Sequence, residues 1–211
     1  IPGDVPLKRA TLAANMETAL NAHWDAGTAP GDRVAIIGAG VVGLLVAHLA
    51  RRIAGTRVTI ADIDPARAAV ADALGFTFVR PDALKAEHRL VFHTSATSAG
   101  LDSALRAAEF EGRIIEMSWY GATPVTVDLG SAFHARRLSL ISSQVGHVAR
   151  KQRQTITHKQ RLTLALQMLS DARLDALVEA ETPFDTLADT LTPLLTATGS
   201  ALPPVIRYSA A

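Results

Sequence analysis

The chain has 211 residues, of which 48% are apolar, enough to bury the core of one large domain. Its 21 Lys and Arg residues nearly balance its 20 Asp and Glu residues, which argues against a nucleic-acid partner or an anionic membrane surface. Cysteine is absent, so disulfides, Cys-ligated zinc and thiol nucleophiles are excluded, and a reducing, cytoplasmic location is expected.

Helical and strand-like patterns alternate along the chain. A helix is expected at 8–24, where apolar residues recur with the 3.6-residue period. Short apolar runs predict strands buried on both faces at 34–37, 58–61, 76–79, 90–94, 113–117 and 138–142. Helices are expected between them at 41–54, 65–74 and 100–108. About six such strands with intervening helices predict an α/β fold, a Rossmann-type doubly wound parallel sheet.

The C-terminal part has a different pattern. Two amphipathic helices and a terminal strand are expected at 158–169, 183–195 and 205–208. We expect an entry helix and linker over 1–30, a Rossmann domain over 31–150, and C-terminal helices with a closing strand over 151–211. Because the chain begins at Ile1 rather than Met, residues 1–30 are expected to follow a further, catalytic domain.

The loop after the first expected strand carries the spacing Gly-x-Gly-x-x-Gly. Gly38 permits a tight turn, Gly40 lets the backbone approach a pyrophosphate, and Gly43 lets the next helix pack closely on the sheet. Val41 and Val42 open that helix, whose unpaired N–H groups and positive dipole end favour phosphate. A purely structural turn can have the same spacing, but the strand before it and the helix after it favour dinucleotide binding.

Asp62 indicates which dinucleotide is preferred. It ends the second expected strand about 20 residues after the last glycine, where a carboxylate accepts hydrogen bonds from the adenosine ribose. Its charge repels a 2′-phosphate, so NAD is favoured over NADP. Arg67 could contact a 2′-phosphate, but Asp62 and Asp64 oppose that role. Asp64 is also suited to cap the helix that starts at Pro65.

Several stretches carry a family resemblance. They are Ala-Ala-Asn-Met-Glu-Thr-Ala-Leu at 13–20, Pro-Gly-Asp-Arg-Val at 30–34, Ile-Ala-Asp-Ile-Asp at 60–64, Phe-Glu-Gly-Arg-Ile-Ile-Glu at 110–116, Ser-Trp-Tyr-Gly at 118–121 and Ser-Ser-Gln-Val-Gly at 142–146. With the glycine fingerprint, they make the chain resemble the cofactor-binding half of the medium-chain dehydrogenase/reductase superfamily, the relatives of zinc-type alcohol dehydrogenases. The resemblance covers nearly the whole chain.

This resemblance implies an NAD(H)-dependent oxidoreductase that transfers hydride between nicotinamide and a small alcohol or carbonyl substrate. The chain would be mainly its cofactor-binding part, inactive alone, while an upstream GroES-like domain would hold the substrate and any zinc. In this Cys-free chain Glu17 could stand in for the usual zinc ligand, although an ordinary polar helix position explains it better. No metal site is expected within the chain itself.

The resemblance also implies contact residues and a homodimer. Loops after the fourth to sixth strands should line the nicotinamide side of the cleft. Beyond the fingerprint and Asp62, the expected cofactor contacts are Thr18, Ile63, Thr94, Ser95, Ser118 and Trp119. The dimer would form near 123–127 and 138–142. Catalytic residues are not assigned.

The other polar and aromatic residues have simpler interpretations. His93, at the end of the fourth expected strand, is a functional candidate. Trp119 and Tyr120 are expected to pack in the core beneath the cofactor, and the basic stretch 147–161 to form a solvated face. A non-catalytic NAD(H)-binding module and a zinc-free, NADPH-dependent quinone or enone reductase remain alternative functions.

Overall fold

The computed structural model describes residues 1–196 and 202–208. Its main body is a six-stranded, fully parallel sheet with the order β3-β2-β1-β4-β5-β6. The strands are β1 (Arg33–Ile37), β2 (Arg57–Ala61), β3 (Thr77–Val79), β4 (His88–His93), β5 (Ala108–Glu116) and β6 (Ser139–Ser142). The expected Rossmann-type α/β fold is therefore confirmed.

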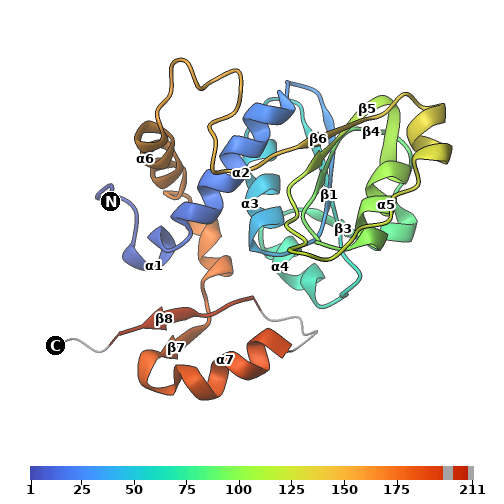
Figure 1. Cartoon of the computed structure of the whole chain (residues 1–211). Helices are drawn as coiled ribbons and strands as arrows, with labels where there is room; N and C mark the ends of the chain where they lie inside the picture. Colours follow the sequence, from blue (N-terminus) through green and yellow to red (C-terminus); the bar gives the residue numbers. More distant parts are fainter. Residues whose placement is uncertain (197–201, 209–211) are drawn as a thin grey trace.

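Helices cover both faces of this sheet (Figure 1). On one side are α2 (Ala13–Ala26), α3 (Val41–Arg51), α4 (Arg67–Ala73) and α6 (His158–Met168), and on the other is α5 (Ser98–Ala107). Val34 and Ile36 of β1 join the core on the α3 side, whereas Ala35 and Ile37 join the core on the α5 side. Burial on both faces explains why this strand is a continuous apolar run.

The first expected helix is interrupted. A short helix α1 (Leu7–Ala10) ends at Thr11, and α2 begins two residues later, so the expectation of one helix over 8–24 is wrong. The side chain of Arg9 explains the separation, because it is buried and donates to the carbonyl oxygen of Leu169 at 3.0 Å and to Asp175 at 2.8 Å. These bonds hold α1 against the segment that follows α6.

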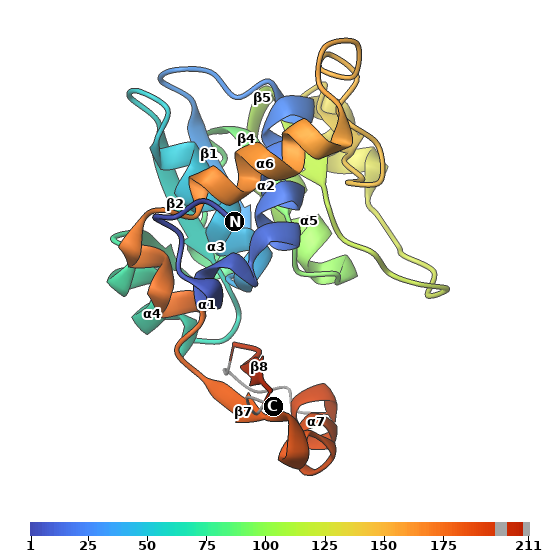
Figure 2. The same cartoon turned by 90° about the vertical axis from the view of Figure 1, so that its left-hand side faces the viewer.

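The C-terminal residues form a small unit beside the main sheet (Figures 1 and 2). It contains β7 (Glu181–Pro183), the 3-10 turn η4 (Phe184–Thr186), α7 (Leu187–Thr196) and β8 (Val205–Arg207). The helix expected at 183–195 therefore begins at Leu187 instead, because Pro183 lies in β7. β7 pairs with β8 in parallel, a pairing that the sequence analysis missed.

Short helical turns complete the description. They are η1 (Pro81–Ala83), the π-helical η2 (Leu129–Phe133) and η3 (Ala172–Leu177). Within the described residues, no helix combines the length and apolar character needed to cross a bilayer. The domain boundaries expected at residues 30 and 150 stay predictions.

Candidate dinucleotide-binding site

The glycine loop leaves β1 at the carboxyl edge of the sheet and packs against the end of β4. Gly38 has a φ of 108°, in the region that favours glycine. A Cβ there would lie 2.8 Å from Thr94 Oγ1, too close for normal contact. Thr94 Oγ1 in turn donates to the carbonyl oxygen of Gly38 at 3.0 Å. The loop and the end of β4 therefore hold each other in place.

The other two glycines of the fingerprint differ in what requires them. A Cβ at Gly43 would overlap the carbonyl oxygen of Gly38, so packing of α3 on the loop demands glycine there. A Cβ at Gly40 would meet no atom within 4 Å, and the φ of −78° suits any residue. Protein packing therefore does not explain Gly40, whereas close approach of a bound pyrophosphate does.

The start of α3 is also left open. Gly40 is the N-cap residue of α3, and no side chain caps its first N–H groups. By contrast, Thr97 caps α5 by accepting a hydrogen bond from Gly100 N at 3.0 Å. The first turn of α3, with Val41 and Val42, thus keeps N–H groups and the positive end of the helix dipole for an anion. These features fit the pyrophosphate of a dinucleotide.

Asp62 lies beside this loop, directly after β2. Its Oδ2 accepts a hydrogen bond from Ala39 N at 2.7 Å, and its Oδ1 accepts one from Asp64 N at 2.9 Å. Each carboxylate oxygen keeps a further lone pair, so the group can also accept from ribose hydroxyls. The bond to Ala39 links the carboxylate directly to the glycine loop, which fixes the spacing of the two parts of the site.

A cavity of about 430 Å³ brings these groups together. Six of the expected cofactor contacts line this cavity, namely Gly38, Gly40, Asp62, Ile63, Thr94 and Ser95. The sequence analysis missed the lining residues Pro81, Thr97, Gly100 and Ser103, and it did not expect Arg67 to line the cavity. Because α5 follows β4 after a short loop, its start reaches the same edge of the sheet, and this connection was the signal that could have identified Thr97, Gly100 and Ser103.

Six expected contacts do not line this cavity: Val41, Val42 and Gly43 of the fingerprint, and Thr18, Ser118 and Trp119 on other segments. Thr18, on α2, donates its hydroxyl hydrogen to the carbonyl oxygen of Ala14 at 3.0 Å. Ser118 lies after β5, where its backbone N donates to Glu116 at 2.8 Å. Trp119 follows it with 89% of its side chain exposed, so the expectation that it packs in the core is wrong. Their contact with a cofactor stays a prediction.

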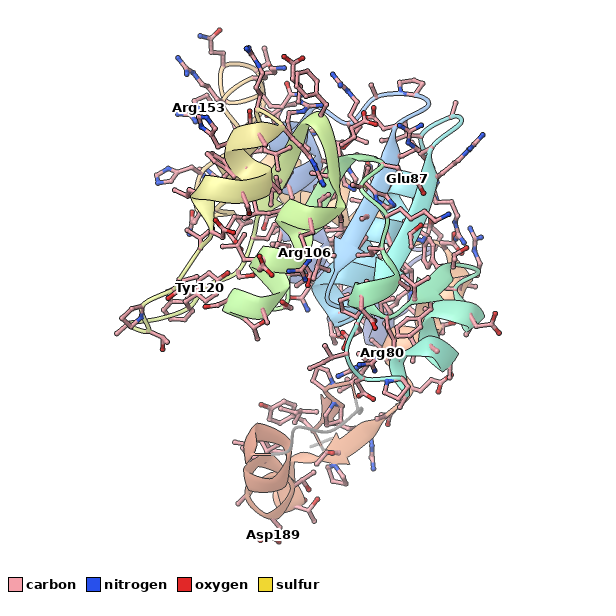
Figure 3. The ribbon with its side chains drawn as sticks, turned by 90° about the vertical axis from the view of Figure 1, so that its right-hand side faces the viewer. Arg80, Glu87, Arg106, Tyr120, Arg153 and Asp189 are labelled. Atoms are coloured by element: carbon pink, nitrogen blue, oxygen red, sulfur yellow. The ribbon has the colours of Figure 1, made fainter. Side chains whose placement is uncertain are left out.

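The loop after β5 explains the exposure of Trp119. It projects from the sheet, and Figure 3 labels Tyr120 on it. The hydroxyl of Tyr120 lies 3.2 Å from Glu116 Oε2 and donates to it. Burial and the adjacent charge of Glu116 raise the pKa of Tyr120 to about 12. Tyr120 therefore stays protonated and remains a hydrogen-bond donor to Glu116.

His93 and Glu116 form the buried polar centre of this edge. They end β4 and β5 in register, and His93 Nδ1 lies 2.7 Å from Glu116 Oε2. Burial by itself would raise the pKa of Glu116, but hydrogen bonds from His93 and Ser118 outweigh it and lower that pKa. From the sequence, His93 was a functional candidate and Glu116 was not, although each is a polar residue at the carboxyl end of an apolar strand.

The basic stretch at 147–161 is only partly a solvated face. Arg153 points outward from its loop (Figure 3), whereas Arg161 is buried. Arg161 Nε donates to Glu17 Oε1 at 2.9 Å, because the start of α6 packs against α2. Glu17 therefore has a structural partner. Among the described residues, no group of three or more His, Asp or Glu side chains is arranged to hold a metal ion.

The fold and this edge of the sheet define an NAD(P)-binding Rossmann domain of the dehydrogenase type. Residues 13–157, more than half of the chain, match the family described as alanine dehydrogenase/PNT, C-terminal domain, and the chain belongs to that family. Among curated proteins, the glutamyl-tRNA reductase of Frankia alni is 43% identical over 89 residues, which are 39% of this chain and 19% of that protein.

The solved structures that share the fold of this chain include zinc-type medium-chain dehydrogenases, as the resemblance implied. An Escherichia coli CFT073 protein described as a short chain alcohol dehydrogenase, complexed with NADH, is 19% identical with a TM-score of 0.73. The match covers 94% of this chain and 58% of that one. A Sinorhizobium meliloti 1021 protein described as a zinc-binding dehydrogenase, bound to NADP, is 17% identical with a TM-score of 0.76. That match covers 96% of this chain and 61% of that one.

The chain thus spans about three fifths of these structures and about a fifth of the curated relative. These relatives are described as dehydrogenases or as a reductase.

Proposed function

We propose that this chain is the cofactor-binding part of an NAD(H)-dependent oxidoreductase acting on an alcohol or carbonyl compound. The observation that carries the proposal is the open space over Gly40, at the uncapped start of α3 and beside Asp62. Bound nicotinamide would supply the hydride donor or acceptor. The chain binds and orients: α3 N–H groups hold the pyrophosphate, and Asp62 accepts from the ribose.

The preference for NAD over NADP rests on charge. Asp62 sits at the cavity wall, and Asp64 follows two residues later. Arg67, which could neutralise a 2′-phosphate, lies 3.9 Å from Asp64 Oδ2. A 2′-phosphate at this position would therefore be repelled by two carboxylates, and one of them, Asp64, is already paired with Arg67.

A fluorescence titration of the chain with NADH and NADPH tests both parts of the proposal. Wild type should bind NADH at least tenfold more tightly, and Asp62→Asn should lose most of that preference. Asp72→Asn is the matched control, because it removes the same charge from an exposed position on α4 outside the cavity and should change the preference less than about threefold. Equal affinity for NADH and NADPH in wild type would refute the NAD preference. No binding of either at millimolar concentration would refute the dinucleotide site.

Two further parts of the proposal concern groups beyond the cofactor. We propose that substrate-binding groups and any zinc come from outside these 211 residues, since the chain spans 58% and 61% of its structural neighbours. We also propose a homodimer through β6, the edge strand of the sheet, where Leu140 has 39% of its side chain exposed. An open strand edge offers unpaired N–H and C=O groups to a second copy.

A further inference from the structure

A chain of hydrogen bonds runs from the interior of the sheet to the wall of the cavity. It begins at Glu116 Oε2, which lies 2.7 Å from His93 Nδ1. His93 is fully buried, and its second nitrogen, Nε2, lies 2.8 Å from Ser95 Oγ. Ser95 lines the cavity that also contains Asp62 and Gly40. This series of hydrogen bonds therefore connects a half-buried carboxylate, through a buried histidine, to a hydroxyl that lines the cavity.

The direction of the protons follows from the acceptor at one end. An ionised carboxylate only accepts, so Glu116 requires a hydrogen on His93 Nδ1. A neutral imidazole with that hydrogen has none on Nε2, so Ser95 donates its hydroxyl hydrogen inward to that nitrogen. Thr97 Oγ1, 3.2 Å from Ser95 Oγ, can donate to it in turn. The oxygen of Ser95 then keeps one lone pair for a ligand. Glu116 is kept ionised by two further donors, Ser118 N at 2.8 Å and the Tyr120 hydroxyl at 3.2 Å.

The position of the Ser95 hydroxyl is set by its surroundings. Ala96 has a φ of 52°, and its N donates to Ser118 Oγ at 3.1 Å, which ties the loop after β4 to the end of β5. On the other side, a Cβ at Gly100 would overlap Ser95 Oγ and lie 2.7 Å from His93 Nε2. Glycine there lets α5 start close against the hydroxyl. The acceptor is thus in place before a ligand arrives.

The other residues of the cavity indicate which part of the ligand reaches Ser95. The same cavity is lined by Asp62, Ile63 and Pro81, and Asp62 is suited to accept from the adenosine ribose. With the ribose at Asp62, the part of a dinucleotide that occupies this cavity is adenosine rather than nicotinamide. Adenosine offers hydrogen-bond donors of two kinds, the 6-amino group of the base and the ribose hydroxyls.

We propose that Ser95 is a specificity-determining hydrogen-bond acceptor for a donor group of the adenosine half of the dinucleotide, with His93 and Glu116 as its positioning residues. This inference rests on the proposed function of the site. His93 and Glu116 act through Ser95 by fixing where its hydrogen points. A ligand that offers a donor at this position is favoured, and one that offers only an acceptor is rejected.

Calorimetric titrations of the whole chain test the proposal. The ligands are NAD⁺, nicotinamide hypoxanthine dinucleotide, which lacks the 6-amino donor, and NAD⁺ analogues whose adenosine ribose lacks its 2′- or 3′-hydroxyl. Wild type should reject at least one analogue about five- to tenfold. Ser95→Ala should remove the discrimination against the analogue that lacks the donor to Ser95, which identifies that donor, whereas any discrimination due to Asp62 should persist in the variant. In Glu116→Gln the His93 ring is no longer required to carry its hydrogen on Nδ1. This variant should therefore reduce the discrimination about two- to threefold.

Controls and refutations separate this inference from the proposed function. Ser170→Ala, at an exposed serine after α6, is the matched control and should behave as wild type. If Ser95→Ala keeps the wild-type ratios, the inference is overturned and the dinucleotide site stands. If wild type binds none of the ligands, both are overturned. If Ser95→Ala fails to fold, wild-type ratios in Glu116→Gln overturn the inference.

Discussion

Replacing Gly43 by Ala should separate the packing role of the fingerprint from its binding role. The new Cβ would overlap the carbonyl oxygen of Gly38 and lie 2.8 Å from Thr94 Oγ1. Both are held in place, because Thr94 donates to the carbonyl oxygens of Ile37 and Gly38 at 3.1 and 3.0 Å. The collision must therefore be relieved by moving α3 away from the loop.

The magnitude follows from two opposing effects. Overpacking of this kind costs about 3 kcal/mol of the free energy of unfolding. Alanine returns about 1 kcal/mol in a helix, because glycine is the poorer helix former. The net loss of about 2 kcal/mol should lower the melting temperature of a chain of this size by about 4–8 °C.

Gly40→Ala is the matched comparison. Its Cβ would enter open space at an accessible φ of −78°, so the expected stability loss is only that of a poorer N-cap, well under about 1 kcal/mol. Its affinity for NADH should fall at least tenfold, since the Cβ occupies the approach of the pyrophosphate. Thermal unfolding followed by circular dichroism, with NADH titration, measures both quantities. Equal melting temperatures for the two variants, or wild-type affinity in Gly40→Ala, would refute this reasoning.

Two other predictions concern pH and assembly. Burial lowers the pKa of His23 and His48 to about 4, so below about pH 6.5 the unfolded chain takes up protons that the folded chain refuses. Urea unfolding should therefore show stability falling between pH 6.5 and 4 by about 2–3 kcal/mol per histidine, and His48→Leu should flatten that slope; an unchanged slope would count against it. Leu140→Lys should weaken self-association at least tenfold in sedimentation velocity, whereas Leu162→Lys, equally exposed at 39% but on α6, should not. Identical sedimentation of both variants and wild type would contradict a dimer through β6.

Local patterns predicted β1, β2 and β4 well because each contains a short apolar run followed by a turn and a helix. Most residues of β1 and β4 are buried, whereas β3 and β6 at the edges of the sheet are more exposed. β5 was expected to begin at 113, yet it begins at Ala108, since the polar residues Glu109 and Glu111 hide its first half. The sequence pattern therefore predicted the C-terminal end of β5 but not its N-terminal end.

Contacts between distant segments decided what the patterns missed. The break between α1 and α2 depends on Arg9 reaching a segment about 160 residues later, as its bond to Leu169 shows. The pairing of β7 with β8 joins Glu181 to Val205 across α7. Neither contact leaves a periodic signal near the residues it affects, because its partner lies elsewhere in the chain.

The amino-acid sequence by itself determined the nucleotide-binding fold and its phosphate loop, because glycine at 38 and 43 and a carboxylate at 62 meet local requirements of backbone geometry and charge. Only the tertiary structure decided that His93 meets Glu116 and turns toward Ser95. That arrangement depends on the register between two parallel strands and on how closely α5 starts against them, and neither is written in the residues of one strand.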